Sequence, residues 1–415
     1  MPPRTSAAAI RDSHQTGCCI VGGGPAGVIL ALLLARAGIP VTLLEMHRDF
    51  DRDFRGDTIH PSVLEIMDEL GLAEPLLKLR HTKLSKATVI TPKGAVTPVD
   101  FTRLKTRYPY IAFMPQARFL EFVIEAAQKY SSFKLIMGAR VDGLIEEDGA
   151  IRGVRYHTEE GEREIRALLT IGADGRFSRV RSLAGFEAIK TSPPMDILWF
   201  RLSRKEGDPE GAGGRIRGGR MLIMLERDTQ WQIGYVIPKG SSKRLHEAGL
   251  DALRQAVAEL EPRFAERVGE LEEWKQVALL SVESDCLKRW HRPGLLVIGD
   301  AAHVMSPVGG VGINYAIQDA VVAANVLASP LKIGRVRMED LAEVQRQREW
   351  PTWFIQKLQT MAQKQVIAEA LDPNKEFTIP MVARILFRIP WLRDLPARLI
   401  AFGVRRVHLN KNALH

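Results

Sequence analysis

Apolar residues occur in short runs along the chain, and several of these runs end at glycine. Residues 18–21 form the first run and reach Gly22, and a longer apolar stretch follows at 25–37. Proline stands at the start of this stretch and Gly38 just past its end, which predicts a helix. Residues 41–45 are apolar on both faces, which is typical of a strand buried in a parallel sheet. Strand, glycine turn, helix and strand in this order predict one βαβ unit.

The rest of the pattern switches between helical and strand-like periods. Helical periodicity predicts helices over 61–71, 116–130, 250–260 and 312–328. Strands are predicted over 133–156, with a turn at Asp148 and Gly149, over 165–172, which runs into a glycine corner and a helix, and over 295–300. Residues 85–113 and 192–287 are otherwise strand-like, and their hydrophilic stretch 201–219 predicts a mobile loop.

Elements of a nucleotide-binding kind therefore alternate with two β-rich stretches. A chain of 415 residues also exceeds what one hydrophobic core usually supports. We expect an α/β fold with a Rossmann-like, discontinuous cofactor-binding domain, an inserted β-sheet domain and a C-terminal helical segment. The expected ranges are 1–84, 114–190 and 286–370 for the first, 85–113 and 191–285 for the second, and 371–415 for the third.

Composition narrows the function classes. The apolar fraction of 46% and the charged fraction of 26% are those of a globular enzyme. No apolar run approaches the roughly 18 residues of a membrane span, and residues 1–15 lack the apolar core of a signal peptide, so we expect a loose tail there. Cys18 and Cys19 are neighbours that cannot staple a fold, and this use of cysteine predicts a reducing, cytoplasmic location.

The net charge of +9 favours anionic partners in general. No run of Lys and Arg is interleaved with aromatic residues, so nucleic acid is not an expected partner. Part of the excess lies near the end of the chain, at Arg384, Arg388, Arg393, Arg398, Arg405 and Arg406. Apolar residues stand between these arginines. The segment is either a helical pair docked by its apolar face or a peripheral contact with an anionic membrane surface.

Candidate chemistry begins at the first glycine cluster. Gly22, Gly24 and Gly27, with Pro25 and Ala26 between them, form G-x-G-x-x-G between a predicted strand and a predicted helix. The three glycines allow a tight turn, close approach of a pyrophosphate and close packing of helix on strand, and the helix N-terminus attracts phosphate.

Glu45 ends the second predicted strand, where a carboxylate can accept hydrogen bonds from the ribose of an adenosine. The pattern predicts a dinucleotide site for FAD or NAD; a glycine turn that only permits tight packing is the alternative.

The stretch GDAAHVMSPVGGVG at 299–312 favours FAD. Asp300 follows an apolar strand, at the sheet edge where ligands of open α/β sheets bind, and it can accept from ribityl hydroxyls. Gly309, Gly310, Val311 and Gly312 then offer bare backbone and a helix start to the flavin ring, whose reduced form is anionic. The alternative is a surface turn capped by Asp300.

Three motifs together resemble a known family. VGGGPAG with Glu45, GADGRFSRVR, and GDAAHVMSPVGGVGINYAIQDA follow one another as in the single-component flavin monooxygenases, the group of para-hydroxybenzoate hydroxylase and the aromatic-polyketide hydroxylases. The resemblance covers nearly the whole chain. It implies non-covalent FAD, NADPH or NADH as reductant, and O2. It further implies hydroxylation of an aromatic or polyketide-like small molecule through a flavin C4a-hydroperoxide, with the β-rich insert as the substrate domain.

The resemblance also assigns roles to residues. Asp174 and Gly175 correspond to the motif associated with both FAD and the reduced nicotinamide, with Arg176 nearby as a cation. Gly299 and Asp300 correspond to the Gly–Asp motif, and Pro307 to the proline beside the flavin.

Two further positions follow from the same resemblance. Arg55 corresponds to the arginine that contacts the cofactor, and Gln116, with Arg118 close by, to the polar residue that opens the middle helix. The alternatives are a solvated arginine at 55 and a polar helix start at 116. Pro307 and Arg55 are the candidates nearest the flavin. His303 is expected to be a hydrogen-bonded residue of its turn.

No residue pattern identifies a substrate-activating base, and no metal-ligand spacing occurs. Polar candidates for the base are His60, Tyr110, Tyr235 and His291. Large apolar residues of the insert either line a substrate pocket or form its core; they are Met195, Trp199, Met221, Met224 and Trp231.

Competing functions stay open at this point. One is a flavin-dependent reductase or dehydrogenase acting on a lipid or prenylated quinone, and another is a flavin-fold binding protein without turnover. Halogenation is not expected, because IGYVIP has Ile233 and Tyr235 where flavin halogenases carry the tryptophans of W-x-W-x-I-P.

Overall fold

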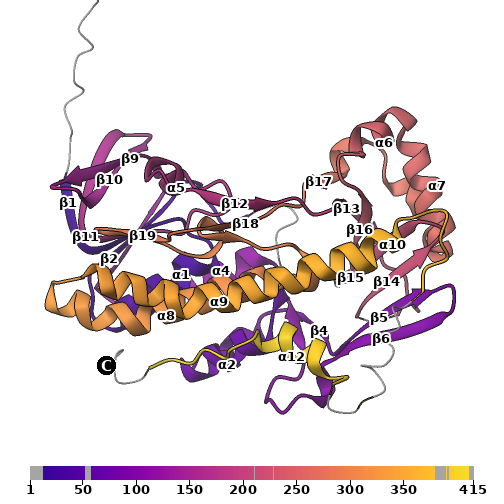
Figure 1. Ribbon diagram of the computed structural model, residues 1–415, viewed down its shortest axis with the longest axis horizontal. Coiled ribbons are helices and arrows are strands. Elements are labelled where there is room, and N and C mark those ends of the chain that lie inside the picture. The colour runs from indigo at the N-terminus through magenta and orange to yellow at the C-terminus, as the bar shows by residue number, and fades with distance from the viewer. Residues whose placement is uncertain are drawn as a thin grey trace, which may run out of the picture.

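An eight-stranded sheet with β1 near its middle forms the centre of one lobe (Figure 1). The computed structural model describes residues 13–51, 58–209, 211–227, 229–378, 389 and 392–410. The strand order is β19-β20-β11-β1-β2-β8, and β10 joins β11 to β9. The strands are β1 (Ser13–Val21), β2 (Val41–Glu45), β8 (Phe133–Met137), β9 (Arg140–Glu147), β10 (Ala150–Thr158), β11 (Gly161–Gly172), β19 (His291–Arg292) and β20 (Leu295–Val297).

The βαβ prediction is confirmed, because β1 pairs in parallel with both β2 and β11. The first strand is longer than predicted, however. It begins at Ser13, inside the expected loose tail, and Ser13 pairs with Glu164 of β11. Polar residues at 14–16 carry no apolar signal, and backbone pairing with β11 extends the strand in spite of them.

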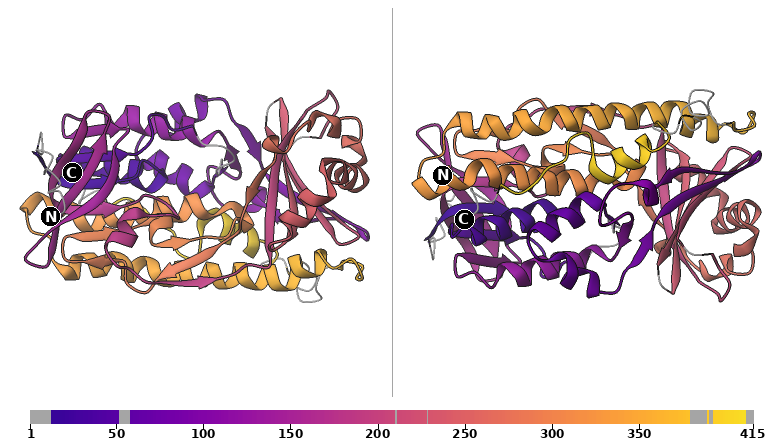
Figure 2. Two further views of the ribbon diagram at one scale, coloured as in Figure 1. Left: turned by 90° about the horizontal axis from the view of Figure 1, so that it is seen from above. Right: turned by 90° about the horizontal axis from the view of Figure 1, so that it is seen from below.

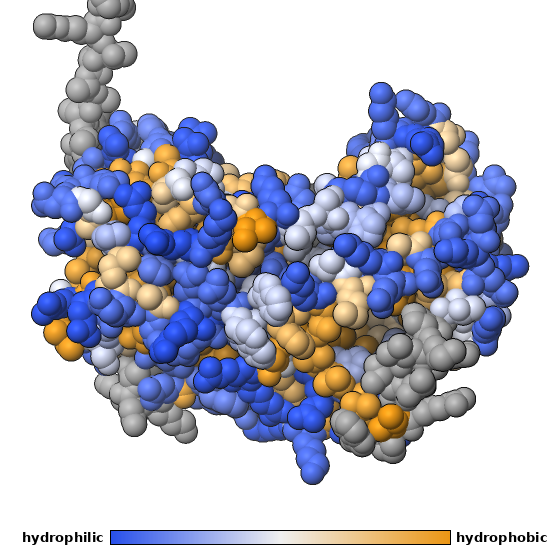
Figure 3. All heavy atoms as spheres, in the orientation of Figure 1, coloured by the Kyte–Doolittle hydropathy of each residue, from blue (hydrophilic) through white to orange (hydrophobic). Residues whose placement is uncertain are grey.

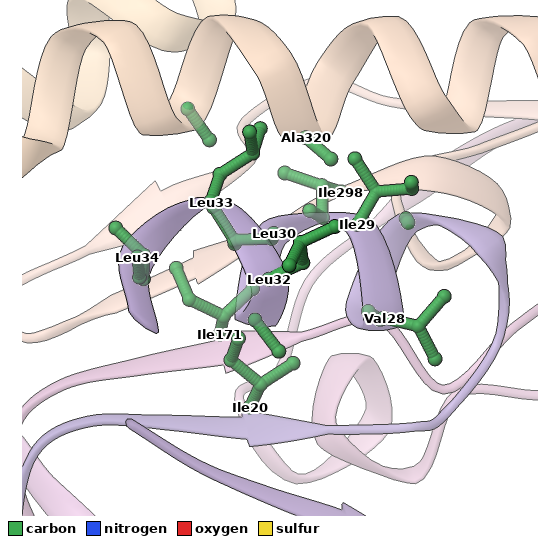
Figure 4. Packing of buried hydrophobic residues seen from close by; sticks show 14 of the residues in the cluster. Ile20, Val28, Ile29, Leu30, Leu32, Leu33, Leu34, Ile171, Ile298 and Ala320 are labelled. Atoms are coloured by element: carbon green, nitrogen blue, oxygen red, sulfur yellow. The ribbon is translucent and has the colours of Figure 1, made fainter. Parts of the chain in front are cut away.

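The helix α1 (Pro25–Arg36) lies between this sheet and the helix α8 (Gly312–Ile333). Side chains from Ala26 to Ala35 are all buried, as expected for a helix that is apolar all round. Figure 4 shows Leu30 and Ile29 on α1 beside Ile298 and near Ala320 of α8, and Ile20 and Ile171 on the strands below. One apolar cluster therefore joins the ends of β1 and β20, each of which is followed by a glycine loop, to the helices α1 and α8 that come after those loops.

Of the other helices, α9 is long, and the rest are short or lie at the periphery. These other helices are α2 (Pro61–Glu69), α3 (Ala73–Lys78), α4 (Gln116–Ala127), α5 (Arg179–Leu183), α6 (Ser242–Ala248), α7 (Leu250–Leu260), α9 (Met338–Ala362), α10 (Ala368–Ala370) and α12 (Leu395–Phe402). A π-helical turn at Gln363–Ile367 joins α9 to α10, and 3-10 turns lie at Phe101–Arg103, Pro262–Phe264, Val268–Glu270, Trp274–Gln276, Gly299–Ala301 and Val308–Gly310.

A seven-stranded sheet forms the second lobe. Its order is β17-β13-β16-β15-β14-β5-β6, with only β14 and β5 parallel. The strands are β5 (Lys86–Thr91), β6 (Gly94–Asp100), β13 (Met195–Ser203), β14 (Ala212–Arg217), β15 (Arg220–Arg227), β16 (Gln230–Pro238) and β17 (Ala278–Leu280). All lie inside the two predicted insert ranges. The division of the chain into a cofactor domain and a substrate domain stays a prediction.

The two faces of this sheet have different neighbours. Leu253 and Val257 of α7 pack on Phe200, Leu222 and the other side chains of one face. Figure 2 shows α6 and α7 on this outer side, while the opposite face is turned toward the first lobe. The space-filling outline is indented between the two lobes (Figure 3).

Two three-stranded sheets lie where the lobes meet. One has the order β12-β18-β21, and the other β3-β7-β4. Their strands are β3 (Thr58–Ile59), β4 (Thr82–Leu84), β7 (Ile111–Phe113), β12 (Ala188–Thr191), β18 (Ser284–Leu287) and β21 (His303–Val304).

The predicted mobile loop at 201–219 is wrong. The stretch contains the end of β13 and all of β14, and its Asp208 is buried against Arg267. Both Arg267 terminal nitrogens donate to Asp208, at 2.5 and 2.8 Å, and Trp231 Nε1 donates at 2.9 Å. At least one of the charges that made the stretch look hydrophilic, Asp208, is paired inside the fold, which hydrophobicity alone does not reveal.

The predicted C-terminal helical segment, 371–415, is described only in part, as α12 and irregular chain. Arg384 and Arg388 lie outside the described residues. Ala397, Ala401 and Phe402 of α12 are buried against Leu84 and neighbouring apolar side chains. Within the described residues, one helical stretch, Val308–Ile333, is long and apolar enough to cross a membrane, and 78% of its most apolar window is buried, as in a core helix.

We expect Asp208→Ala to lower the free energy of unfolding by about 3–5 kcal/mol, because Arg267 is left buried without its counter-charge. Hydrogen bonds from Arg267 lower the pKa of Asp208. Its contribution should therefore be present above roughly pH 4, the range of an unfolded aspartate, and be lost as the pH falls below that range.

Urea unfolding at several pH values measures this effect. Glu266→Ala is the control, because it removes only an exposed pair with Lys205 and should change the free energy of unfolding by less than about 0.5 kcal/mol. Equal losses in both variants at neutral pH would contradict the structural importance of the buried pair.

Candidate functional site

The first glycine loop, residues 22–27, joins β1 to α1 and has one open position. A Cβ on Gly22, which has φ +107°, would lie 2.5 Å from the Ala173 carbonyl oxygen, and a Cβ on Gly27 would lie 1.9 Å from that of Gly22. A Cβ on Gly24 would meet nothing closer than 4.0 Å. Two glycines are thus required for packing, while Gly24 at the N-cap of α1 faces open space that a ligand can approach.

Glu45 at the end of β2 faces this loop. Its Oε2 accepts from the Gly23 N–H at 2.8 Å, and its Oε1 accepts from the His47 N–H at 2.9 Å. The side chain is buried, and the two bonds fix its orientation. Carboxylate oxygens have further acceptor capacity, so Glu45 fits the predicted role toward a ribose.

The second loop, residues 173–178, follows β11 and lies against the first through Gly22. Asp174 accepts from Ser178 Oγ at 2.5 Å and from the Val180 N–H at 3.0 Å, which holds the start of α5. Burial raises the pKa of Asp174, and these hydrogen bonds oppose the shift. Gly175 has φ +78°, a conformation that favours glycine at this corner.

The third loop, residues 299–312, completes the arrangement. Gly299 has φ +62°, and a Cβ there would lie 3.2 Å from the Cβ of Ala26 and 3.3 Å from that of Ala316. The third loop therefore touches the start of α1. Asp300 follows in the 3-10 turn after β20 and is half-buried. The three loops meet at the carboxyl ends of the parallel strands β1, β11 and β20, where open α/β sheets bind ligands.

A buried ionic network that the sequence analysis missed supports the third loop. Asp319 on α8 accepts from the Gly299 N–H at 3.0 Å, from His303 Nε2 at 2.6 Å and from Arg348 Nε at 2.7 Å. Asp319, His303 and Arg348 are each no more than 1% exposed. Burial raises the pKa of Asp319, but the interactions with His303 and Arg348 lower it more, so the net direction is down. His303 is a hydrogen-bonded residue of its turn, as expected.

The end of the third loop is pressed against two other segments. A Cβ on Gly309 would lie 3.5 Å from Ile400 of α12. Thr58 Oγ1 donates to the Gly310 carbonyl at 3.1 Å, and a Cβ on Gly310 would lie 3.6 Å from His60 Nε2. Gly312 then begins α8, so this loop presents a helix N-terminus, as predicted.

His60 is the candidate base that lies nearest the third loop. Its Nδ1 lies 2.8 Å from the Ile400 carbonyl, and burial lowers its pKa to about 4, although the carbonyls of Ile400 and Gly310 act against the shift. His60 is therefore neutral near pH 7. Tyr235 lies in the cluster under α7, on the outer face of the sheet, and His291 lies on the edge strand β19.

Two further residues, Arg55 and Gln116, were predicted to bind the cofactor. Arg55 lies outside the described residues. Gln116 is the first residue of α4 and is half-buried, and Arg118 is exposed.

The inner face of the seven-stranded sheet carries an apolar platform that lies against the third loop. We define the platform as Met195, Ile197, Trp199 and Val236, with the half-buried Met221, Ile223 and Leu225. Val308, next to Pro307, packs against it.

A flat strip crosses the platform. Trp199, Gly234 and Ile223 are direct cross-strand neighbours, and a Cβ on Gly234 would lie 2.9 Å from the Trp199 ring. Glycine thus lets the indole lie against the sheet. Met224 and Trp231, by contrast, are core residues under α7.

A family model and a relative of named activity both match most of this chain. The FAD binding domain family model matches residues 15–349. The 6-methylpretetramide 4-monooxygenase of Streptomyces rimosus is 33% identical over 399 residues, which cover 94% of this chain and 93% of the relative.

Solved structures share the fold. The p-nitrophenol 4-monooxygenase of Pseudomonas putida DLL-E4 has a TM-score of 0.77 at 19% identity and covers 95% of this chain and 100% of its own. The myxobacterial chondrochloren halogenase has a TM-score of 0.73 at 19% identity, covering 97% of this chain and 95% of its own. At these identities the structural likeness concerns the fold alone.

We expect Gly24→Val to abolish FAD retention while the protein still folds. The branched side chain would occupy the space that the pyrophosphate needs, but it would meet no protein atom closer than 4.0 Å at Cβ. The loss of a favourable N-cap residue should cost about 1 kcal/mol.

The measurement is the flavin content of the purified variant together with its urea unfolding curve. Gly38→Val is the control, because a Cβ at Gly38 also meets nothing within 4 Å but lies at the far end of α1. Its φ of +74° adds strain without touching the loop. Normal FAD content in Gly24→Val would show that the first loop does not bind the pyrophosphate.

Proposed function

Since this chain belongs to the FAD-binding-domain family of flavin monooxygenases, we propose that its substrate is a fused-ring phenol of the polyketide type, bound between the third loop and the apolar platform. The protein is an FAD-dependent hydroxylase that uses NAD(P)H and O2 on an aromatic substrate. The overall reaction is substrate–H + NAD(P)H + H⁺ + O2 → substrate–OH + NAD(P)⁺ + H2O. The observation that carries the fused-ring proposal is the flat strip of Trp199, Gly234 and Ile223 in the cluster against which Val308 packs.

The residues present fit FAD. Gly24 leaves room for the pyrophosphate at the N-terminus of α1, and Glu45 is oriented toward the same loop. We propose that Asp300 accepts from the ribityl chain and that Gly309 to Gly312 lie under the ring. The bound cofactor supplies the reductive activation of O2.

The chain itself must place the substrate and exclude water from the reacting centre. The half-buried Met221, Ile223 and Leu225 of the platform offer apolar surface, and Val308, next to Pro307, packs against the same cluster. His60 is neutral and buried behind Gly310, so we propose that it shapes this loop rather than exchanging a proton with bulk water.

A cytoplasmic location is part of this proposal. Cys18, Cys19 and Cys286 are free thiols, which supports a reducing compartment. The buried apolar side of α12 and the pair between Arg406 and Glu65 support docking of the described C-terminal segment on the protein rather than on a membrane.

The decisive experiment uses three probes: anhydrotetracycline, 6-methylpretetramide and p-nitrophenol, which appear in the names of relatives. NADPH oxidation and incorporation of 18O from 18O2 are measured for each. We expect the fused-ring probes to stimulate NADPH oxidation and to gain one 18O atom, and p-nitrophenol to do so weakly. Reduction of a quinone or lipid without 18O incorporation would favour the reductase alternative, and absence of NADPH oxidation would favour a binding protein.

We expect Ile223→Ala to raise the KM for the fused-ring probe about tenfold, because it removes apolar contact from the platform. Flavin content should not change, since Ile223 is not part of the three loops. Leu279→Ala is the control: this residue is 49% exposed and belongs to β17 of the same sheet. Steady-state kinetics of both variants provide the measurement, and a KM unchanged in Ile223→Ala would remove the platform from the binding site.

A further inference from the structure

Three glutamines on one side of α9 and its π-helical extension hold residues 304–308, the segment around Pro307. Gln356 Nε2 donates to the Val304 carbonyl at 3.0 Å and to the Asp285 carbonyl at 2.8 Å. This first contact also ties β18 to the start of the segment.

The next two glutamines continue the series. Gln359 Nε2 donates to the carbonyls of Ser306 at 2.9 Å and Val308 at 2.8 Å, and Gln363 Nε2 contacts Ser306 Oγ. Gln359 is 6% exposed and Gln363 is 2% exposed. We call Gln356, Gln359 and Gln363 the glutamine ladder.

The ladder covers the place where a strand ends. β21 ends at Val304, and Pro307 already has helical dihedrals (φ −68°, ψ −8°) before the 3-10 turn Val308–Gly310. The backbone of residues 304–308 therefore leaves the strand pattern. Glutamines three and four apart lie on one face of a helix, and Gln356 and Gln359 donate to the carbonyls of Val304, Ser306 and Val308.

The helix α9 and the residues that follow it contact both the support of the third loop and the platform. Toward its N-terminus, Arg348 holds Asp319, which accepts from the Gly299 N–H. Past the ladder, Ile367 is buried in the platform cluster and Leu371 packs against it. Figures 1 and 2 show α9 and α10 reaching from beside α8 to the second sheet.

The π-helical turn at Gln363–Ile367 begins at the last glutamine of the ladder. Such turns occur frequently at functional sites, because they re-aim the side chains that follow. Here the turn lies between the residue that contacts Ser306 and the residue that packs into the platform.

We propose that the glutamine ladder positions the third loop relative to the apolar platform and so determines how completely reduced flavin and O2 are used for hydroxylation. This inference rests on the proposed function. Displacing a reacting group by about 1 Å can cost a hundredfold in rate, and water in the gap diverts the reaction to NAD(P)H + H⁺ + O2 → NAD(P)⁺ + H2O2. The ladder glutamines are positioning residues, since they act through the backbone of the third loop.

The test compares Gln359→Leu with Gln345→Leu. Gln345 lies on the same helix, is 9% exposed and also bonds backbone, accepting from the Trp290 N–H and donating to the Lys288 carbonyl, but it does not touch the third loop. Both variants lose buried amide contacts, so loss of stability alone should affect them similarly.

Three quantities are measured on the FAD-loaded proteins: H2O2 formed per NADPH oxidised with the fused-ring probe, the visible circular dichroism of the flavin, and the Kd for FAD from fluorescence titration. We expect Gln359→Leu to raise the H2O2 fraction at least about fivefold and to alter the flavin circular dichroism, because the third loop moves. Gln345→Leu should match the wild type in both.

Equal H2O2 fractions and equal circular dichroism in the two variants would overturn the proposal. Should Gln359→Leu fail to fold, Ser306→Ala replaces it: this change removes the contact with Gln363 and the bond that Ser306 Oγ accepts from the Val308 N–H, and the same directions are expected at smaller size. Failure of the proposed function would appear instead in the wild type, as absence of 18O in every probe, whereas the circular dichroism and FAD titration would still report on the ladder.

Discussion

The close approach of Gly22 to the backbone of Ala173 and Asp174 is the constraint on which the site depends. A single Cβ at Gly22 would come within 2.5 Å of the Ala173 carbonyl oxygen, so the ends of β1 and β11 can lie together only if this residue is glycine. Gly299 repeats the condition between Ala26 and Ala316, and it brings in the end of β20. Three loops far apart in the sequence thereby form one edge, while Gly24 is left open toward the ligand.

Charge and amide groups behind this edge hold it in place. Asp319 fixes Gly299 through one N–H and is itself held by His303 and Arg348. The ladder then fixes the segment after it from the same long helix, α9. Since the π-helical turn after α9 places Ile367 in the platform cluster, the third loop and the platform are held by one continuous helical segment. Apolar packing alone would stabilise each lobe, but it would not set the distance between the two lobes.

Much of the fold could be predicted from the sequence because its signals are local. Residues 41–45 and 250–260 were predicted at the observed bounds of β2 and α7. Each prediction used only the residues of the segment itself: an apolar run on both faces for β2, and helical periodicity for α7. The resemblance to flavin monooxygenases is confirmed by the family match over 15–349.

What was missed depends on long-range pairing. Ser13 belongs to β1 because it pairs with β11, and Asp208 is neutralised by Arg267. Each bond between the ladder and residues 304–308 joins positions more than fifty apart in the sequence. An acid such as Asp319 within an apolar helix was a visible signal, but its partners His303 and Arg348 were not.

The central claim is that the three loops bind one FAD that NADPH can reduce. Its most direct test is the visible absorbance spectrum of the purified protein before and after anaerobic addition of NADPH. The account predicts two flavin bands that bleach; a colourless protein that does not take up added FAD would contradict it.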